Sequence, residues 1–233
     1  MSKIVCFGEV LWDIFPTHKK IGGAPLNVAL RLQTFENEVA LISCLGDDKL
    51  GNELLLELQK YRISSLYIQK IKTYKTSTVS ISLDKNGSAS YLINHPCAWD
   101  NIQLNDKLNS LVKSSEAFIF GSLIARDSTS KNTLLTLLNY SKFSVFDVNL
   151  RPPHYDISSI QVLMNAANFI KFNDNELKEI SMSLGFNGKS IEQTILFIAN
   201  KTNTTSIAVT LGSNGAILFY DNLFFYNKGY RVK

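Results

Sequence analysis

The chain has 233 residues, of which 45% are hydrophobic and 19% charged, and its formal net charge is +4. Such a length can bury a large core, and the scattered lysines give no indication of nucleic-acid or anionic-membrane binding. Lys3, Glu9 and Asp13 interrupt the first apolar region, and no run approaches about 18 apolar residues. The sequence therefore predicts neither a signal peptide nor a transmembrane helix.

The first part of the chain alternates between buried-strand and amphipathic-helix patterns. Continuous apolar runs indicate strands with both faces buried, and spacings of three and four residues indicate helices. We predict strands at 4–7, 11–15 and 39–45, and helices at 25–35 and 50–61. In the first helix, Val28, Leu32 and Phe35 are expected on one side, and Asn37 is expected to supply the left-handed stop after Glu36.

The segment from 76 to 93 has a different pattern. Residues 76–83 and 88–93 are β-branched or alternating, and Asp84-Lys85-Asn86-Gly87 between them is a hairpin signal. With residues 11–15, this hairpin is expected to form a small sheet over the Gly22-Gly23 turn. The lid segments would be about 11–20 and 76–96.

From Leu104 the strand and helix alternation resumes. We predict helices at 104–112, 128–139, 158–167, 173–184 and 191–201, and strands at 117–120, 143–148, 169–172, 207–211, 216–220 and 223–226. Repeated βα units imply right-handed crossovers, so the fold class is α/β, with a doubly wound, mainly parallel sheet and helices on both faces. Residues 1–233 are expected to form a single domain.

The stretch Gly22-Gly23-Ala24-Pro25-Leu26-Asn27 is a candidate floor for a small polar ligand. Adjacent glycines allow close backbone approach, Pro25 suits a first helical turn, and Asn27 offers a donor and an acceptor for neighbouring hydroxyls. The alternative is a strand-to-helix turn whose glycines only make the bend.

Polar residues follow several predicted strands, and ligands of such sheets gather at the carboxyl ends of the strands. They are Asp13, Gly121-Ser122, Asp147 to Arg151, Asn173 to Glu176, and Thr210 to Gly215. Each alone is a weak signal, whereas five at one sheet edge indicate a site.

These motifs carry a resemblance. Gly22-Gly23-Ala24-Pro25-Leu26-Asn27-Val28-Ala29, with Gly46 further on, resembles the first signature of the ribokinase-like (PfkB) carbohydrate kinases, and Gly8 to Asp13 and Gly121-Ser122-Leu123 look most like the fructokinase branch. The resemblance implies a ribokinase-like fold with a β-sheet lid. It also implies an ATP- and Mg²⁺-dependent kinase acting on a sugar hydroxyl, with sugar and ATP as its small-molecule partners.

By this resemblance, Asp13, Gly22, Gly23, Asn27 and Arg151 would bind the substrate sugar. A carboxylate such as Asp13 can accept from two hydroxyls, and the planar cation of Arg151 suits either sugar or phosphoryl oxygens. The alternatives are a solvated carboxylate for Asp13 and a surface ion pair for Arg151.

The same resemblance assigns Asn173, Thr210, Gly212 and Gly215 to the nucleotide and Glu176 to the metal, through water. Asn173 and Glu176 also fit a helix capping box, and both roles can hold together. The alternative for residues 210–215 is a hairpin turn at Asn214-Gly215.

The family's second signature, a Gly-Ala-Gly-Asp segment that supplies the catalytic base and the anion hole, does not occur in these 233 residues. No catalytic residue is therefore assigned, and the expected Asp base would lie beyond Lys233. We expect an incomplete chain that lacks the C-terminal part of the fold, has weak or no activity and exposes apolar surface. The alternative is a catalytically silent sugar- or nucleotide-binding protein from a shortened gene.

The remaining features limit the functional assignment. Cys6, Cys44 and Cys97 are widely spaced and odd in number, which indicates reduced thiols of a cytoplasmic protein. The three histidines, His18, His95 and His154, have no partner spacing and are interpreted as lid or loop residues. No Gly-x-Gly-x-x-Gly follows the first strand, which argues against a dinucleotide oxidoreductase. The identity of the sugar is open, and a homodimer through apolar Ile81, Leu83 and Leu92 of the lid is possible.

Overall fold

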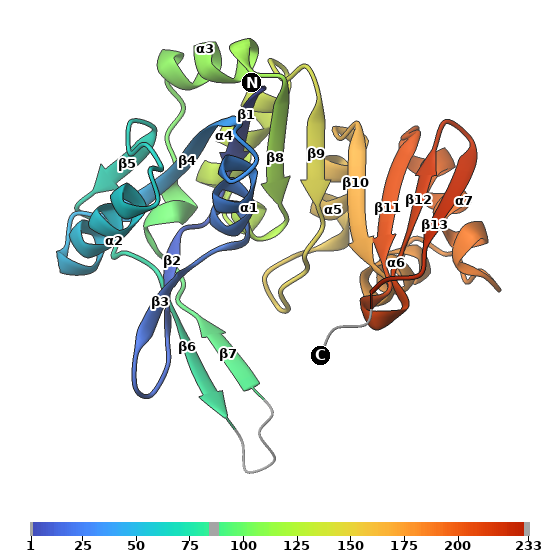
Figure 1. The fold of residues 1–233 in the computed structure, drawn as a ribbon, viewed down its shortest axis with the longest axis horizontal. Helices are drawn as coiled ribbons and strands as arrows, with labels where there is room; N and C mark the ends of the chain where they lie inside the picture. Colours follow the sequence, from blue (N-terminus) through green and yellow to red (C-terminus); the bar gives the residue numbers. More distant parts are fainter. Residues whose placement is uncertain (1, 84–88, 231–233) are drawn as a thin grey trace. The chain divides into compact units, whose positions relative to one another are not determined.

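The computed structural model describes residues 2–83 and 89–230 and has two compact units (Figure 1). Unit 1 contains the chain up to Phe120 together with Ile124–Lys142, and unit 2 contains Gly121–Leu123 and the chain from Phe143 onward. The single domain over 1–233 stays a prediction. The predicted turn at Asp84-Lys85-Asn86-Gly87 lies outside the described residues.

Unit 1 is built on parallel strands in the order β8-β1-β4-β5. These strands are β1 (Lys3–Phe7), β4 (Glu38–Gly46), β5 (Ile68–Ile71) and β8 (Ala117–Gly121). The register pairs Phe7 with Ile42 on one side and with Phe120 on the other. Three of the strands confirm the sequence prediction, whereas β5 was not predicted because Gln69 and Lys70 interrupt its apolar pattern.

Four helices cover the two faces of this sheet. They are α1 (Ala24–Gln33), α2 (Lys49–Lys60), α3 (Asp106–Ser114) and α4 (Ser128–Leu138). The connections through α1 and α2 run from β1 towards β5, and those through α3 and α4 run the opposite way, so right-handed crossovers put the two pairs on opposite faces. Leu26, Leu41 and Leu54 have no exposed surface in the core under α1 and α2.

The structure corrects two details of α1. Val28 and Leu32 pack against the core as predicted. The buried residues of the helix, however, are Pro25, Leu26 and Ala29, and Phe35 is 63% exposed because the helix ends at Gln33. The predicted left-handed stop at Asn37 is also wrong: Glu36 adopts it with φ 61°, and Asn37 instead donates from Nδ2 to the Leu32 carbonyl at 3.0 Å.

A small separate sheet of unit 1 has the order β3-β2-β6-β7. Its strands are β2 (Leu11–Ile14), β3 (Lys19–Gly22), β6 (Thr78–Leu83) and β7 (Ala89–Ile93). This confirms the predicted small sheet and adds β3, a strand that was not predicted from the sequence. Asp13 pairs with Lys20 of β3 and, in the parallel direction, with Val79 of β6. A lid function of this sheet stays a prediction.

Unit 2 contains three parallel strands followed by two antiparallel ones. The strands are β9 (Ser144–Asp147), β10 (Phe169–Asn173), β11 (Ser206–Thr210), β12 (Ala216–Tyr220) and β13 (Leu223–Asn227), and the helices are α5 (Ile157–Asn165), α6 (Asp174–Ser183) and α7 (Ile191–Thr202). All of these elements were predicted from the sequence. No helix among residues 2–83 and 89–230 combines the length and apolar character that crossing a bilayer requires.

The helices of unit 2 lie on one face of its strands. The order β9-β10-β11 advances in one direction, so right-handed crossovers place α5, α6 and α7 on the same side (Figure 1). Ile170, Phe172 and Val209 point to that side and are fully buried. On the other side, the directly paired residues of β12 and β13 form an exposed apolar group, which we call the open face: Leu218, Tyr220, Leu223 and Phe225.

We expect the open face to cause self-association, because an exposed apolar patch is a contact surface. Replacing Leu218 and Phe225 by Thr should keep the strands and weaken association. Sedimentation velocity over a range of concentrations should show a sedimentation coefficient that rises less for this double variant than for the unmodified chain. Leu66→Thr, at a single residue that is 68% exposed, is the matched control and should change nothing. A monomer at every concentration before substitution would contradict the expectation.

Candidate active site

The carboxylate of Asp13 lies directly against the backbone of Gly22. A Cβ atom built on Gly22 would be 2.3 Å from Asp13 Oδ2, far inside contact distance. Gly22 ends β3 and is opposite Leu11 of β2, so the antiparallel ladder sets this approach. The structure thus brings together two of the predicted sugar-binding residues, and any side chain at 22 would displace the Asp13 carboxylate from its present position.

Gly23 has a different reason to be glycine. It is the N-cap of α1 with φ 113°, and a Cβ there would be 2.2 Å from the Glu9 carbonyl oxygen. The side chain of Glu9, only 3% exposed, accepts a hydrogen bond from the Ala24 N–H at 3.1 Å. The start of α1 therefore faces a carboxylate of the chain itself. Sequence reasoning missed this role of Glu9, because the cap lies 15 residues before the N–H that it accepts.

Asp13 itself is a partly exposed carboxylate with spare acceptor capacity. Among the described residues, no side chain or backbone group donates a hydrogen bond to it. Burial raises the pKa of Asp13 above the usual aspartate value. A carboxylate in such a position gains from any ligand that brings hydroxyl donors.

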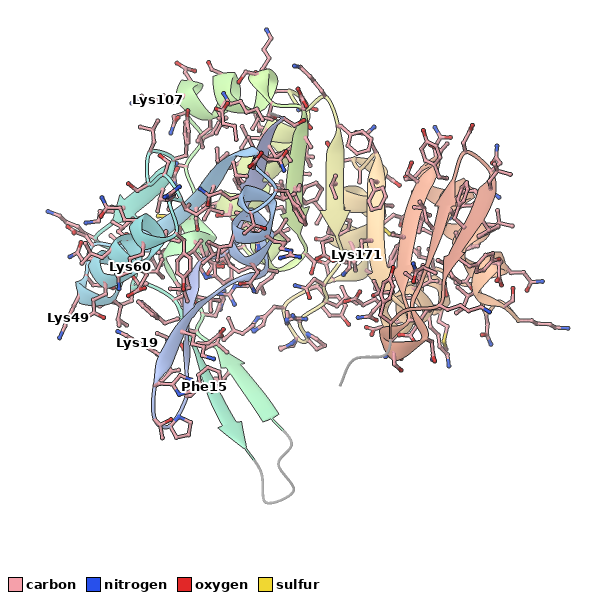
Figure 2. All side chains as sticks on the ribbon, in the orientation of Figure 1. Phe15, Lys19, Lys49, Lys60, Lys107 and Lys171 are labelled. Carbon is pink, nitrogen blue, oxygen red and sulfur yellow. The ribbon has the colours of Figure 1, made fainter. Side chains whose placement is uncertain are left out.

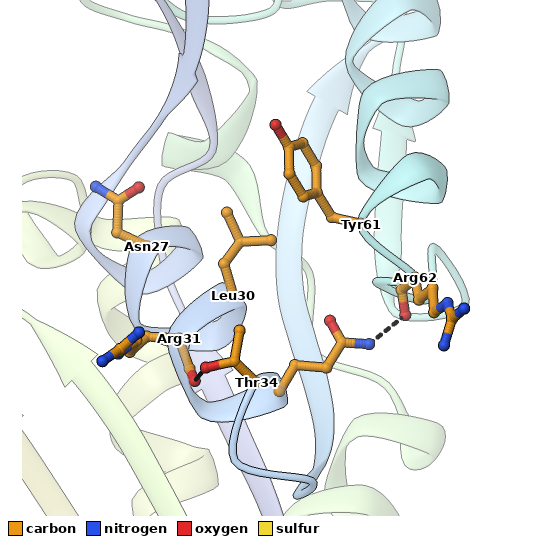
Figure 3. Close-up of a pocket in the computed structure, with 7 residues that line it drawn as sticks. Asn27, Leu30, Arg31, Thr34, Tyr61 and Arg62 are labelled. Carbon is orange, nitrogen blue, oxygen red and sulfur yellow. Dashed lines mark hydrogen bonds between the residues drawn. The ribbon is translucent and has the colours of Figure 1, made fainter.

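Asn27 lies on the exposed side of α1, one turn after Gly23, and its N–H donates to the Gly23 carbonyl at 2.9 Å. Its side chain is at one end of an open hollow of about 550 Å³ between α1 and the end of α2 (Figure 3). The guanidinium groups of Arg31 and Arg62 lie on opposite sides of this hollow and point away from Leu30. They do not converge, so the hollow is not built as an anion site.

In unit 2, Asn173 and Glu176 form the capping box of α6. Asn173 Oδ1 accepts from the Glu176 N–H, and Glu176 Oε2 accepts from the Asn173 N–H, both at 2.8 Å. The capping interpretation from the sequence is confirmed. Asn173 is also the register partner of Thr210, so these two predicted nucleotide residues lie side by side on β10 and β11.

Glu176 has a further contact that links α6 to the loop after β9. Its Oε1 accepts a hydrogen bond from the Leu150 N–H at 3.0 Å, and the residue is only 6% exposed. Both carboxylate oxygens are therefore already bonded to backbone N–H groups. Each oxygen keeps one lone pair, which fits a contact to Mg²⁺ through water better than direct coordination.

The loop after β9 carries Arg151, the predicted substrate residue of unit 2. Its side chain is exposed, and Nη1 donates to the Leu150 carbonyl at 2.9 Å. The surface ion pair that the sequence left open for Arg151 is not found among the described residues. Nearby, the carboxylate of Asp147 is paired at 2.8 Å with Lys171, whose position Figure 2 labels.

Residues 210–215 form the tight connection between β11 and β12. Leu211 donates to the Gly215 carbonyl at 2.8 Å around a 3₁₀ turn at Gly212–Asn214, as the hairpin interpretation predicted. Gly212 has φ 57° and Gly215 has φ 97°, so both need the left-handed region. Whether this turn also holds a nucleotide stays a prediction.

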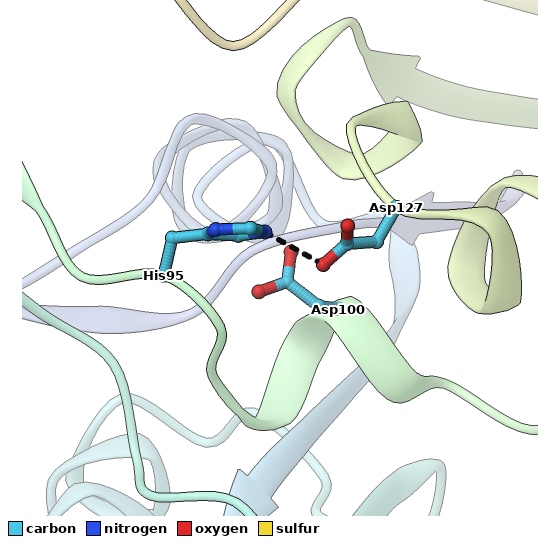
Figure 4. Close-up of side chains that lie close together, drawn as sticks. All are labelled: His95, Asp100 and Asp127. Carbon is cyan, nitrogen blue, oxygen red and sulfur yellow. Dashed lines mark hydrogen bonds and ion pairs between the residues drawn. The ribbon is translucent and has the colours of Figure 1, made fainter.

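His95 has a carboxylate partner that the sequence spacing did not reveal. His95 Nε2 is 2.9 Å from Asp127 Oδ2, and Asp100 lies beside them (Figure 4). The three residues approach the arrangement of a metal site. However, Arg126 donates to both oxygens of Asp100, at 2.7 and 2.8 Å, so that carboxylate is already neutralised. We therefore interpret the group as a structural network. His95 lies in a loop, as predicted.

Comparison with known proteins decides the family. The model of the pfkB family carbohydrate kinases matches residues 1–233. The chain belongs to the pfkB family. This confirms the resemblance found in the sequence and the prediction of a carbohydrate kinase.

Relatives of this pfkB kinase include several fructokinases. A probable fructokinase-2 of Arabidopsis thaliana is 26% identical over 91% of this chain and 70% of its own length, and a putative sugar kinase of Pyrococcus horikoshii is 29% identical over 92% and 71%. The crystal structure of a Xylella fastidiosa fructokinase with bound ATP has a TM-score of 0.87 at 20% identity, over 99% of this chain and 75% of that one. This likeness confirms the fold.

The two glycines of the β11–β12 turn give a matched test in this pfkB kinase. A Cβ on Gly215 would be 1.8 Å from the Asn227 carbonyl oxygen, whereas a Cβ on Gly212 would meet nothing within 4 Å. We expect Gly212→Ala to lower the free energy of unfolding by about 1 kcal/mol, from backbone strain alone. Gly215→Ala should lower it by about 3 kcal/mol or more. Urea denaturation measures both, and equal losses would show that the turn relaxes freely.

Proposed function

We propose that this chain has the sugar and nucleotide sites of an ATP-dependent kinase, whose reaction is transfer of the γ-phosphoryl group of ATP to a hydroxyl of fructose or a related sugar, and that residues 1–233 alone have weak or no activity. The observation that carries the proposal is the Asp13 carboxylate, which lies against Gly22 and has no donor among the described residues. Sugar hydroxyls are the donors that such a carboxylate accepts.

In unit 1, Asp13 would accept from two neighbouring sugar hydroxyls, and Gly22 and Gly23 would form the floor beneath the ring. Asn27 would add a donor and an acceptor from the first turn of α1. The small sheet would act as a lid that excludes water. Relatives named as fructokinases support a sugar of this class.

In unit 2, Asn173, Thr210, Gly212 and Gly215 would bind the nucleotide, and Arg151 would neutralise charge on the transferred phosphoryl group or hold the sugar. Mg²⁺ would neutralise the nucleotide phosphates when bound, and Glu176 would contact it through water. Supporting structures of similar fold include a fructokinase with bound ATP and a Vibrio cholerae fructokinase variant with fructose, ADP and a potassium ion.

The substitution Asp13→Asn is expected to weaken sugar binding without lowering the free energy of unfolding. The amide keeps the shape and loses the negative charge, so fructose affinity measured by calorimetry should fall on the order of 10²-fold. Because burial raises the pKa of Asp13, stability from this group is present at low pH and is lost as pH rises through the raised pKa. The free energy of unfolding at pH 7 should therefore not fall in the variant.

The pH dependence of binding has the opposite sign. Fructose affinity of the unmodified chain should decrease as pH falls through the raised pKa of Asp13, and the dependence should vanish in Asp13→Asn. The matched control is Asp174→Asn, at an exposed carboxylate of unit 2. Unchanged fructose affinity in Asp13→Asn would overturn the sugar site.

We expect weak or no phosphoryl transfer by residues 1–233 alone. A general base contributes about 10²–10⁴-fold, and no Gly-Ala-Gly-Asp segment occurs in the sequence. Coupled assays of ADP production with fructose and other sugars measure this directly. Turnover at about 1–100 s⁻¹ would mean that another residue serves as the base. Sugar or nucleotide binding without turnover would favour the catalytically silent alternative.

Two further parts of the proposal concern assembly and location. A homodimer through the small sheet is supported by Leu92, which is 70% exposed; the side chains of Ile81 and Leu83 lie outside the described set. A cytoplasmic location is supported by Cys6, Cys44 and Cys97, which are free, buried thiols.

A further inference from the structure

The hairpin β6–β7 is joined to the rest of unit 1 by two short segments, which we call its roots. The first root is Thr76 and Ser77, before β6, and the second is Asn94 and His95, after β7. A hydrogen-bond network that includes a carboxylate holds each root. At the first root, Asp48 accepts the Thr76 N–H at 2.9 Å and the Thr76 hydroxyl at 2.8 Å. Asp48 is also the N-cap of α2, accepting from the Gly51 N–H at 2.8 Å. Burial alone would raise the pKa of Asp48, but these hydrogen bonds outweigh it and hold the pKa below the usual value.

The second root follows β7 and is held by Arg126. Its Nη2 donates to the Asn94 carbonyl at 2.7 Å, while Nε and Nη2 bind the two oxygens of Asp100. The side chains of Arg126 and Asp100 are only 3% and 0% exposed. His95, which follows Asn94, makes a second contact: its Nε2 lies 2.9 Å from Oδ2 of Asp127, the residue after Arg126 (Figure 4).

The face of the Arg126 guanidinium makes a further contact, although Nη1 has no hydrogen-bond partner among the described residues. Its guanidinium lies 4.0 Å from the centroid of the Trp99 ring, and Trp99 is fully buried. Asp100 in turn accepts the Cys97 N–H at 2.8 Å, which closes the 3₁₀ turn Ala98–Asn101 after the second root. A planar cation with several donors in fixed directions is needed to satisfy this set together.

Hydrogen bonds lead from the second root to the strand that carries Asp13. Asn94 donates to the Thr78 carbonyl at 3.2 Å, and Thr78 is the register partner of Trp12 on β2. From the first root, Ser77 accepts the Trp12 N–H at 3.1 Å. Asp13 follows Trp12 and is paired with Val79. The two roots thus set the position of β2 from both ends of the hairpin.

We propose that Arg126 and Asp48 are positioning residues for sugar binding: they fix the two roots of the β6–β7 hairpin and so hold Asp13 over Gly22. This inference rests on the proposed function, since Asp13 is the sugar-binding group. Neither residue is expected to touch the sugar. Their substitution moves the carboxylate and leaves the nucleotide residues of unit 2 unchanged.

Arg126→Lys tests the second root. A single ammonium group cannot hold both oxygens of Asp100 and the Asn94 carbonyl at once, so the root loosens. Calorimetry should show a fructose Kd raised on the order of tenfold, with the Kd of a non-hydrolysable ATP analogue changed by less than about twofold. Hydrogen exchange followed by mass spectrometry should show faster exchange at residues 77–80 and 92–95, and unchanged exchange in α4.

Asp48→Asn tests the first root and keeps a good helix N-cap. It should give the same separation between fructose and nucleotide affinity, with faster exchange at residues 76–79. Arg62→Lys, at an exposed arginine of unit 1, is the matched control for Arg126→Lys and should change neither affinity nor exchange.

If Arg126→Lys does not fold, the uncharged pair Asp100→Asn with Arg126→Gln replaces it and carries the same expectation. Unchanged exchange at both roots, or fructose and nucleotide affinities that fall together, would overturn the proposal. If the unmodified chain binds no sugar, the proposed function fails, and the exchange data alone still decide whether the two residues fix the roots.

Discussion

The close packing of the Asp13 carboxylate against Gly22 is the constraint on which the candidate site depends. A side chain at position 22 would occupy the place of Asp13 Oδ2, 2.3 Å from the built Cβ. The antiparallel ladder of β2 and β3 fixes this approach, and the parallel pairing of β2 with β6 ties it to the hairpin. A partly desolvated carboxylate without a donor is costly to a folded chain, and such a cost is typical of a binding position.

Three buried carboxylates, by contrast, have structural roles. Glu9 caps the start of α1, Asp100 binds Arg126, and Glu176 closes its capping box while holding the loop that carries Arg151. Each accepts at least one hydrogen bond from a fixed donor of the chain. Asp13 differs from these three because the described residues offer it no donor. This contrast, together with the family, supports the proposal that Asp13 binds the substrate.

Much of the fold followed from the sequence, because buried strands and amphipathic helices have distinct apolar periods. The strand β5 was not predicted because two polar residues interrupt its short apolar pattern. The strand β3 was not predicted because it begins with Lys19 and Lys20 and has no apolar run. The glycine pair and the capping box of α6 could also be predicted, because they are local sequence patterns. The contacts of Glu9, Asp48 and Arg126 could not be predicted, because they join segments from 15 to 32 residues apart that only the fold brings together.

The central claim assigns the floor of the sugar site to unit 1 and the nucleotide to unit 2, and footprinting by hydrogen exchange tests it most directly. Saturating fructose should protect residues 9–14 and 20–27, and a non-hydrolysable ATP analogue with Mg²⁺ should protect residues 173–176 and 210–215. Fructose protection confined to unit 2, or no protection of residues 20–27 at saturation, would contradict the account.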